Sequence, residues 1–267
     1  MAKPASPRVA WPFIAALAAL IATVFFMLPR GPLVPWPTPS RTPSVSRTIT
    51  WPAPSTASPT ERWRTEITPT RAPNPSPRPT TDAASVALDA AYGTFDELRA
   101  AGSGDAIVRL PEDVSNGVVA FQHDGTRLVQ LQSRDAGGGF LESLVSRAGE
   151  PYRGTTAFGV LSPGRTRALA ITASGPWRMT IRPMSSAARA TLPASGQGDA
   201  VLVYAGGVRR VTASHRGESN FIVWAARGDE RSLLANVVAN GQQTSRLGVS
   251  PAVVSVKADG AWNLAPA

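Results

Sequence analysis

The chain contains no cysteine, and histidine and lysine are nearly absent from its 267 residues. Without cysteine it can form neither disulfide bonds nor thiolate metal sites. Its two histidines are too few for a three-histidine zinc site. Lysine occurs only as Lys3 and Lys257 among 27 basic residues, so arginine supplies almost all of the positive charge. We predict that the protein holds no metal and no cofactor.

The positive charge is unevenly distributed. The formal net charge is +9, and residues 1–81 carry nine basic against two acidic side chains, which is +7 of that total. Residues 82–267 are therefore only mildly basic. They show no cluster of Lys and Arg of the kind that nucleic-acid binding requires, so we expect no nucleic-acid partner.

Residues 10–28 form an uncharged run of nineteen residues. As a helix this run would be about 28 Å long, which matches the hydrocarbon core of a bilayer. A cleaved signal peptide would need small residues after the apolar core, but the bulky residues 25–28 occupy that place. Lys3 and Arg8 favour a cytoplasmic tail at 1–9. The sequence predicts a transmembrane signal anchor in the plasma membrane, with the C-terminal part extracytoplasmic.

Proline dominates the next segment, residues 29–81. Fourteen of the 25 prolines lie between Pro29 and Pro79, among many Thr and Ser. Such a segment favours extended, polyproline-like conformations and cannot bury a core, which predicts a disordered linker. A short helix is expected at 82–93, because Asp82 is a good N-cap and Gly93 a good C-cap.

The remainder of the chain contains an internal repeat. Three segments recur in the same order: 104–108 as 198–202, 119–125 as 211–217, and 168–177 as 253–262. The only two histidines, His123 and His215, fall at equivalent positions. This pattern predicts a tandem duplication with repeats at 94–184 and 185–267.

Both repeats consist of short β-branched runs separated by glycine-rich turns. In the second repeat seven strands are expected, at 200–204, 208–215, 220–225, 233–239, 243–249, 252–257 and 262–264. Strands at this spacing predict an all-β fold of two tandem, small antiparallel β-sandwich or jelly-roll repeats, each with its own apolar core.

The repeat also resembles a known family. The second copy carries Gly198-Asp199, His215-x-Gly217-x-Ser219-Asn220-Phe221, Leu233-Leu234-x-Asn236 and Ala258-Asp259-Gly260-x-Trp262. These motifs resemble an uncharacterised tandem β-sandwich repeat of extracytoplasmic, membrane-anchored actinobacterial proteins. The first copy lacks the Ser-Asn-Phe triplet and has Ser174 in place of Asp259. The resemblance implies a fold and a compartment, but no activity.

Individual residues leave alternatives open. The two histidines are turn hydrogen-bonders or binding residues, and the aspartates are turn caps or calcium ligands. The candidate binding residues are His123, His215, Asn220 and Trp224. The expected structural anchors are Trp177, Trp262, Asp105, Asp199 and Asp259.

These observations predict a binding or adhesion module displayed on a stalk, without catalysis. The expected partner is a cell-wall polymer or another surface protein. Two alternatives are a glycan-active hydrolase and a structural subunit of a membrane complex. A carboxylate pair in an open cleft would favour the hydrolase, and a large exposed apolar patch would favour the subunit.

Overall fold

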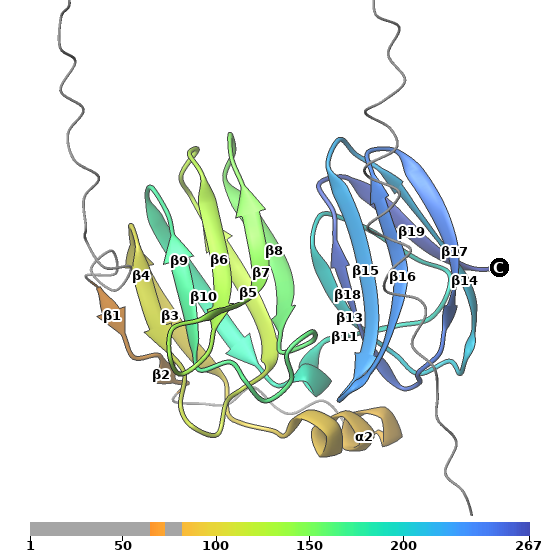
Figure 1. The fold of residues 1–267 in the computed structure, drawn as a ribbon, viewed down its shortest axis with the longest axis horizontal. Coiled ribbons are helices and arrows are strands. Elements are labelled where there is room, and N and C mark those ends of the chain that lie inside the picture. The colour runs from red at the N-terminus through yellow and green to blue at the C-terminus, as the bar shows by residue number, and fades with distance from the viewer. Residues whose placement is uncertain (1–64, 73–81) are drawn as a thin grey trace, which may run out of the picture. The chain divides into compact units, whose positions relative to one another are not determined.

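The computed structural model describes residues 65–72 and 82–267 (Figure 1). The predicted tail at 1–9, the predicted membrane span at 10–28 and most of the predicted linker lie outside the described residues. Within the described ranges, no helix is both long and apolar enough to cross a bilayer.

The described part is all-β, as predicted, and its first half is a β-sandwich of two five-stranded sheets. One sheet has the strand order β1-β4-β9-β6-β7 and the other β2-β3-β10-β5-β8. The strands are β1 (Glu66–Ile67), β2 (Thr70–Arg71), β3 (Leu98–Ser103), β4 (Ala106–Arg109), β5 (Gly117–His123), β6 (Val129–Arg134), β7 (Phe140–Arg147), β8 (Tyr152–Phe158), β9 (Ala168–Thr172) and β10 (Pro176–Arg182).

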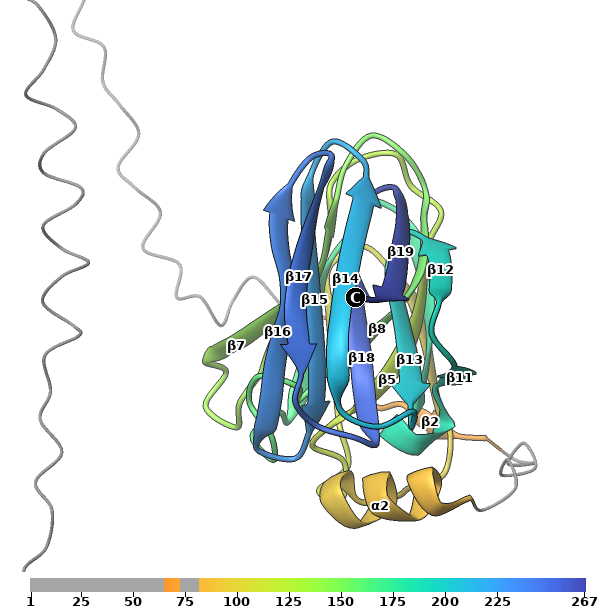
Figure 2. The ribbon, with the colours of Figure 1, turned by 90° about the vertical axis from the view of Figure 1, so that its right-hand side faces the viewer.

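The second half repeats this strand order. Its sheets are β11-β13-β18-β15-β16 and β12-β19-β14-β17, and Figure 2 shows the latter sheet in front. A 3-10 turn, η3 (Met184–Ser186), precedes it. The strands are β11 (Ala188–Ala190), β12 (Ala194–Gln197), β13 (Ala200–Tyr204), β14 (Arg209–Arg216), β15 (Asn220–Arg227), β16 (Glu230–Val238), β17 (Gly241–Leu247), β18 (Ala252–Lys257) and β19 (Ala261–Pro266).

The four edge strands β1, β2, β11 and β12 were not among the expected strands. Each has only two to four residues and is largely exposed, so none carries an alternating apolar pattern. Strands β1 and β2 also lie inside the segment predicted as a disordered linker, so that prediction was wrong for residues 65–72. Ile67 packs on the first core. Pro69 lies in the connection between β1 and β2, where its missing N–H interrupts no strand pairing.

Each sandwich has a core between its own two sheets. Alternating residues of facing strands supply it, as in Leu131 of β6, Ile171 of β9 and Phe121 of β5. Phe221 and Leu264 occupy the corresponding core of the second sandwich. The strand period of two thus fixes which side chains point inward and which point outward.

A third apolar cluster joins the two sandwiches. Helix α2 (Ala83–Tyr92) contributes Leu88 and Tyr92. Ala157 of β8 lies in the same cluster, together with Val201 and Val253 of the second sandwich. Because these side chains are buried only where the sandwiches and α2 meet, the junction is part of the hydrophobic core of the protein.

Candidate functional site

The Gly-x-Gly-Asp motif of the first repeat supports a buried tryptophan. The indole Nε1 of Trp177 donates to the carbonyl of Gly104 at 2.9 Å, and Gly104 has a positive φ of 74°. A Cβ atom at Gly102 would lie only 2.7 Å from the Trp177 ring. Asp105 accepts a hydrogen bond from the backbone N–H of Ala173 at 3.0 Å. The motif therefore combines space for the ring, an acceptor for its N–H and a cap for the next turn.

The second repeat reproduces this arrangement. Trp262 donates to the carbonyl of Gly198 at 2.9 Å, and a Cβ atom at Gly196 would lie 2.4 Å from its ring. Asp199 accepts from the backbone N–H of Ala258 at 2.9 Å. Asp105 and Asp199 thus have the same capping role. The described residues contain no group of three or more His, Cys, Asp or Glu placed to hold a metal ion.

His215 is held by three contacts inside the second sandwich. Its Nδ1 donates to the carbonyl of Ala239 at 2.9 Å, and its Nε2 lies 3.2 Å from Oδ1 of Asp259. Its ring stacks on Phe221 with 4.8 Å between centroids. These contacts orient the imidazole at the end of β14 and bury it.

Asp259 also closes the loop that follows β14. Its Oδ2 accepts from the backbone N–H groups of Glu218 and Ser219, at 2.9 Å and 2.7 Å. Burial acts to raise the pKa of Asp259, but these hydrogen bonds outweigh it and hold the pKa below its usual value.

His123, the equivalent residue of the first sandwich, is fully buried. Neither of its ring nitrogens has a hydrogen-bond partner among the described residues. For Nε2 the difference follows from Ser174, which stands where the second repeat has Asp259. Burial lowers the pKa of His123, with Asp124 acting weakly in the opposite direction. The two histidines belong to separate sandwich cores and do not converge on one site.

Installing the missing carboxylate, with Ser174→Asp, should raise the pKa of His123, because a negative charge beside the ring favours its protonated form. In the parent protein the pKa of His123 is lower in the folded state than in the unfolded chain, so the unfolded chain binds a proton more readily. The contribution of His123 to stability is therefore complete above about pH 6.5 and is lost as the pH falls below that value. The variant should make stability depend less on pH in this range, because its folded-state pKa lies closer to that of the unfolded chain. NMR titration of the ring and urea unfolding at pH 5 and pH 8 would measure both effects; an unchanged His123 titration would contradict the assignment.

The two remaining candidate binding residues lie on β15. Asn220 is exposed at the start of the strand. Trp224 is partly buried and packs against the cluster that joins the sandwiches. With the histidines in separate cores, these four residues do not form a common site.

Buried charges gather where the sandwiches meet. Arg147 of β7 donates to Oδ1 of Asp199 at 3.0 Å and to the carbonyl of Ala258 at 2.8 Å. Tyr152 donates its hydroxyl to Oδ2 of Asp199 at 2.8 Å. Burial raises the pKa of Tyr152, and the charge of Asp199 adds to the shift. Asp199, but not its counterpart Asp105, therefore links the two sandwiches.

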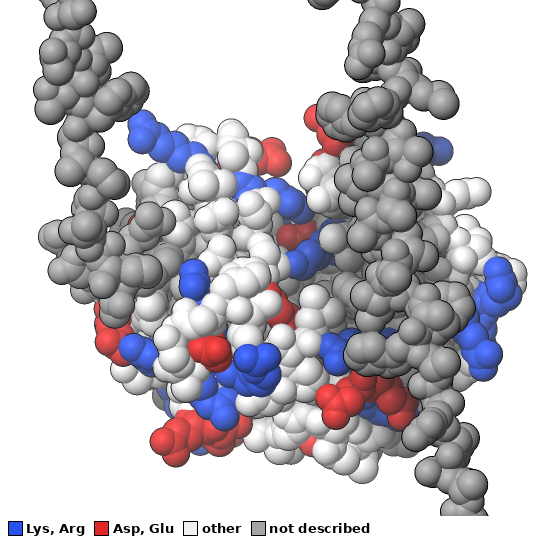
Figure 3. Space-filling model, in the orientation of Figure 1, with Lys and Arg blue, Asp and Glu red and all other residues white. Residues whose placement is uncertain are grey.

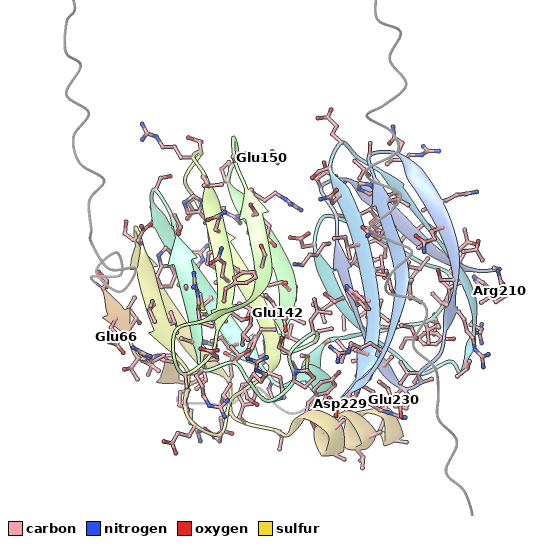
Figure 4. The ribbon with its side chains drawn as sticks, viewed as in Figure 1. Glu66, Glu142, Glu150, Arg210, Asp229 and Glu230 are labelled. Carbon is pink, nitrogen blue, oxygen red and sulfur yellow. The ribbon has the colours of Figure 1, made fainter. Side chains whose placement is uncertain are left out.

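A second buried carboxylate, Glu142 of β7, lies near the group formed by Arg147, Tyr152 and Asp199. Glu142, marked in Figure 4, accepts from the backbone N–H of Leu161 at 3.1 Å and of Ser162 at 2.9 Å. Burial raises its pKa, and these hydrogen bonds oppose the rise. Lys257 donates to the carbonyl of Ser143, and burial lowers its pKa. Such pKa shifts can mark an active site. Here Glu142 and Lys257 already have hydrogen-bond partners within the protein, at the junction of the sandwiches.

The outward face of the sheet β2-β3-β10-β5-β8 is hollowed, with a volume of about 820 Å³. Side chains that cross this face in register line the hollow. One row is Ala101, Arg178, Gln122 and Arg153, and the next is Thr70, Arg99, Thr180, Ala120 and Thr155. Neither Asp nor Glu is among the lining residues.

The second sandwich has a hollow of about 820 Å³ on the corresponding sheet. Ser214, Gln242 and Asn263 line it, at the positions that Gln122, Arg153 and Arg178 occupy in the first sandwich. Ser214 pairs with Asn263 on one side and with Gln242 on the other. In the same way Gln122 pairs with Arg178 and with Arg153 in the first sandwich, so the positions are equivalent. Three arginines therefore line the hollow of the first sandwich, whereas amide side chains and the single arginine Arg216 line the hollow of the second.

Comparison with known proteins assigns this chain to no family. No protein-family model matches the chain, and no curated protein matches its sequence. A regulatory subunit of a cAMP-independent protein kinase A from Trypanosoma brucei is similar over 72% of this chain and 85% of its own, with 8% identity and a TM-score of 0.22. A likeness at this level carries no argument about fold or function.

Apart from His215 and Trp262, which line the second hollow, the residues of the hollows were not among the candidates from the sequence. Gln122, Arg153 and Arg178 are far apart in the chain, and only the strand register places them in one row. A signal does exist: Arg178 follows Trp177 and Gln122 precedes His123, so each is the outward neighbour of a buried residue. Strand alternation could have found their orientation, but not their neighbours.

Proposed function

We propose that the protein is a membrane-anchored, extracytoplasmic binding or adhesion module without catalytic activity. In this proposal residues 10–28 anchor the chain and the proline-rich segment carries the sandwiches away from the membrane. A cell-envelope polymer or a surface protein is the partner. The charge and proline content of residues 1–81 support the anchor and stalk.

The observation that carries the proposal is the pair of hollows at equivalent sheet positions. Both are open surfaces on regular strands, and polar side chains line most of each. A sheet face holds such side chains at fixed spacings, which suits recognition of an extended partner. Glu142, whose pKa is raised, and the buried Asp199 lie at the junction instead, and no carboxylate lines either hollow.

The rigid connection between the sandwiches supports the same role. Apolar packing around α2 and the Arg147–Asp199 pair bury the surfaces between them. A partner that contacts both sandwiches would then meet preorganised surfaces, which lowers the entropic cost of binding. Charges on the face drawn in Figure 3 are interspersed rather than gathered into one patch.

Co-sedimentation with purified cell wall tests the proposal. The full chain in detergent micelles should pellet with the wall material, whereas a chain ending at residue 81 should stay in the supernatant. The short chain is the matched control, because it keeps the anchor and +7 of the net charge. Equal retention of the two chains, or no retention of either, would refute binding by the sandwiches.

A further inference from the structure

We propose that the hollow of the first sandwich binds a linear anionic envelope polymer through Arg99, Arg153 and Arg178. This inference rests on the proposed function and names the chemistry of the ligand. The hollow of the second sandwich has Asn263 and Gln242 where the first has Arg178 and Arg153, and Arg216 is the arginine that lines it.

Arg178 is the central residue of the site. It is exposed on β10, and its Nε donates to the side-chain oxygen of Gln122 at 2.9 Å. Within the described residues no carboxylate forms an ion pair with it. Because the partner is the neutral amide of Gln122, the guanidinium of Arg178 has no neutralising charge beside it in this contact. Its remaining N–H donors can bind an anionic group.

The other two arginines flank this centre. Arg153 faces Gln122 from β8, and its only described acid partner, Asp124, is 3.8 Å away. Arg99 is in the next row on β3 and pairs with Glu97 at 2.7 Å. Because neighbouring strands are about 4.8 Å apart, Arg178 and Arg153 are about 10 Å apart at the backbone. This spacing suits a polymer with regularly repeated carboxylates or phosphodiesters.

The shape and lining favour such a polymer over other anions. No aromatic side chain is exposed in the hollow: Phe121 borders it but is 2% exposed. Single-stranded nucleic acids need aromatic platforms for their bases. The threonine hydroxyls of the second row instead offer hydrogen bonds to sugar or polyol groups.

The second sandwich supplies the variants that test the site. Arg178→Asn together with Arg153→Gln introduces the residues found at the equivalent positions Asn263 and Gln242, so this surface is compatible with them. The control is Arg210→Gln with Arg246→Gln, which removes the same charge from two exposed, directly opposed arginines outside both hollows. Arg210 is marked on β14 in Figure 4.

The experiment measures binding of the full chain to three immobilised polymers: polygalacturonate, poly(glycerol phosphate) and neutral dextran. We expect binding to one or both anionic polymers but not to dextran; the two anionic arms distinguish carboxylate from phosphodiester recognition. The hollow double variant should bind at least about tenfold more weakly, and the control double variant within about twofold of the parent. Raising the salt concentration should weaken parent binding.

The reciprocal change tests sufficiency. Asn263→Arg with Gln242→Arg should strengthen binding to the same polymer, because the chain would then carry two sites. Equal loss in the hollow and control variants, or binding to dextran alone, would overturn the inference while leaving a binding function in place. Failure to bind any polymer together with failure to pellet with cell wall would overturn both proposals.

Discussion

Trp262→Ala should lower the free energy of unfolding by about 3–5 kcal/mol. The ring is 5% exposed, lies in the core of the second sandwich and donates to the carbonyl of Gly198 at 2.9 Å. Its removal leaves a cavity against Gly196, which has no side chain to fill the space. Urea denaturation of the full chain, followed by far-UV circular dichroism, would measure the loss.

A phenylalanine control separates packing from hydrogen bonding at this position. Trp262→Phe keeps most of the ring contact but removes the indole N–H, so it should cost about 1–2 kcal/mol. Trp177→Ala should resemble Trp262→Ala, because the first sandwich has the same contacts. A loss below about 1 kcal/mol for either alanine variant would show that the tryptophans are not the anchors of their cores.

Asp199→Ala is expected to cost about 3 kcal/mol, whereas Asp105→Ala should cost about 1 kcal/mol. Both changes remove a turn cap, but only Asp199 also leaves Arg147 and Tyr152 without their partner at the junction. The expected loss of stability for Asp199→Ala is moderate because Arg147 is 25% exposed and keeps its hydrogen bond to the Ala258 carbonyl.

The same pair of variants tests whether the junction is rigid. Hydrogen exchange should speed up in α2 and along β8 and β13 for Asp199→Ala, and should stay near the parent values there for Asp105→Ala. Equal effects of the two substitutions on stability and exchange would contradict a special role of Asp199 in joining the sandwiches.

Much of the fold could be predicted from local patterns. Strands β13 and β18 begin and end at the expected residues, and β15 starts at Asn220 as expected. Asp82 caps α2 through the backbone N–H of Ser85 at 2.6 Å, as its residue type indicated. These features depend on neighbours in the chain, so a periodic pattern or a capping residue is enough to indicate them.

The contacts between segments that are distant in the chain could not be predicted from local sequence patterns. Asp105 and Asp199 look alike in sequence, and only the approach of β7 and β8 to the second sandwich gives Asp199 its partners Arg147 and Tyr152. Likewise His123 and His215 are equivalent in sequence, yet neither ring nitrogen of His123 has a partner within the described residues. His215 instead bonds the Ala239 carbonyl through Nδ1 and has its Nε2 3.2 Å from Asp259.

By itself, the sequence determined the all-β class, the internal repeat and the inward position of the tryptophans, because alternation and turn residues act over a few positions of the chain. The tertiary structure decided which outward side chains share a row and which charges are buried together. Strand register and sandwich packing join residues more than fifty positions apart, such as Gln122 and Arg178, and no local pattern specifies those pairings.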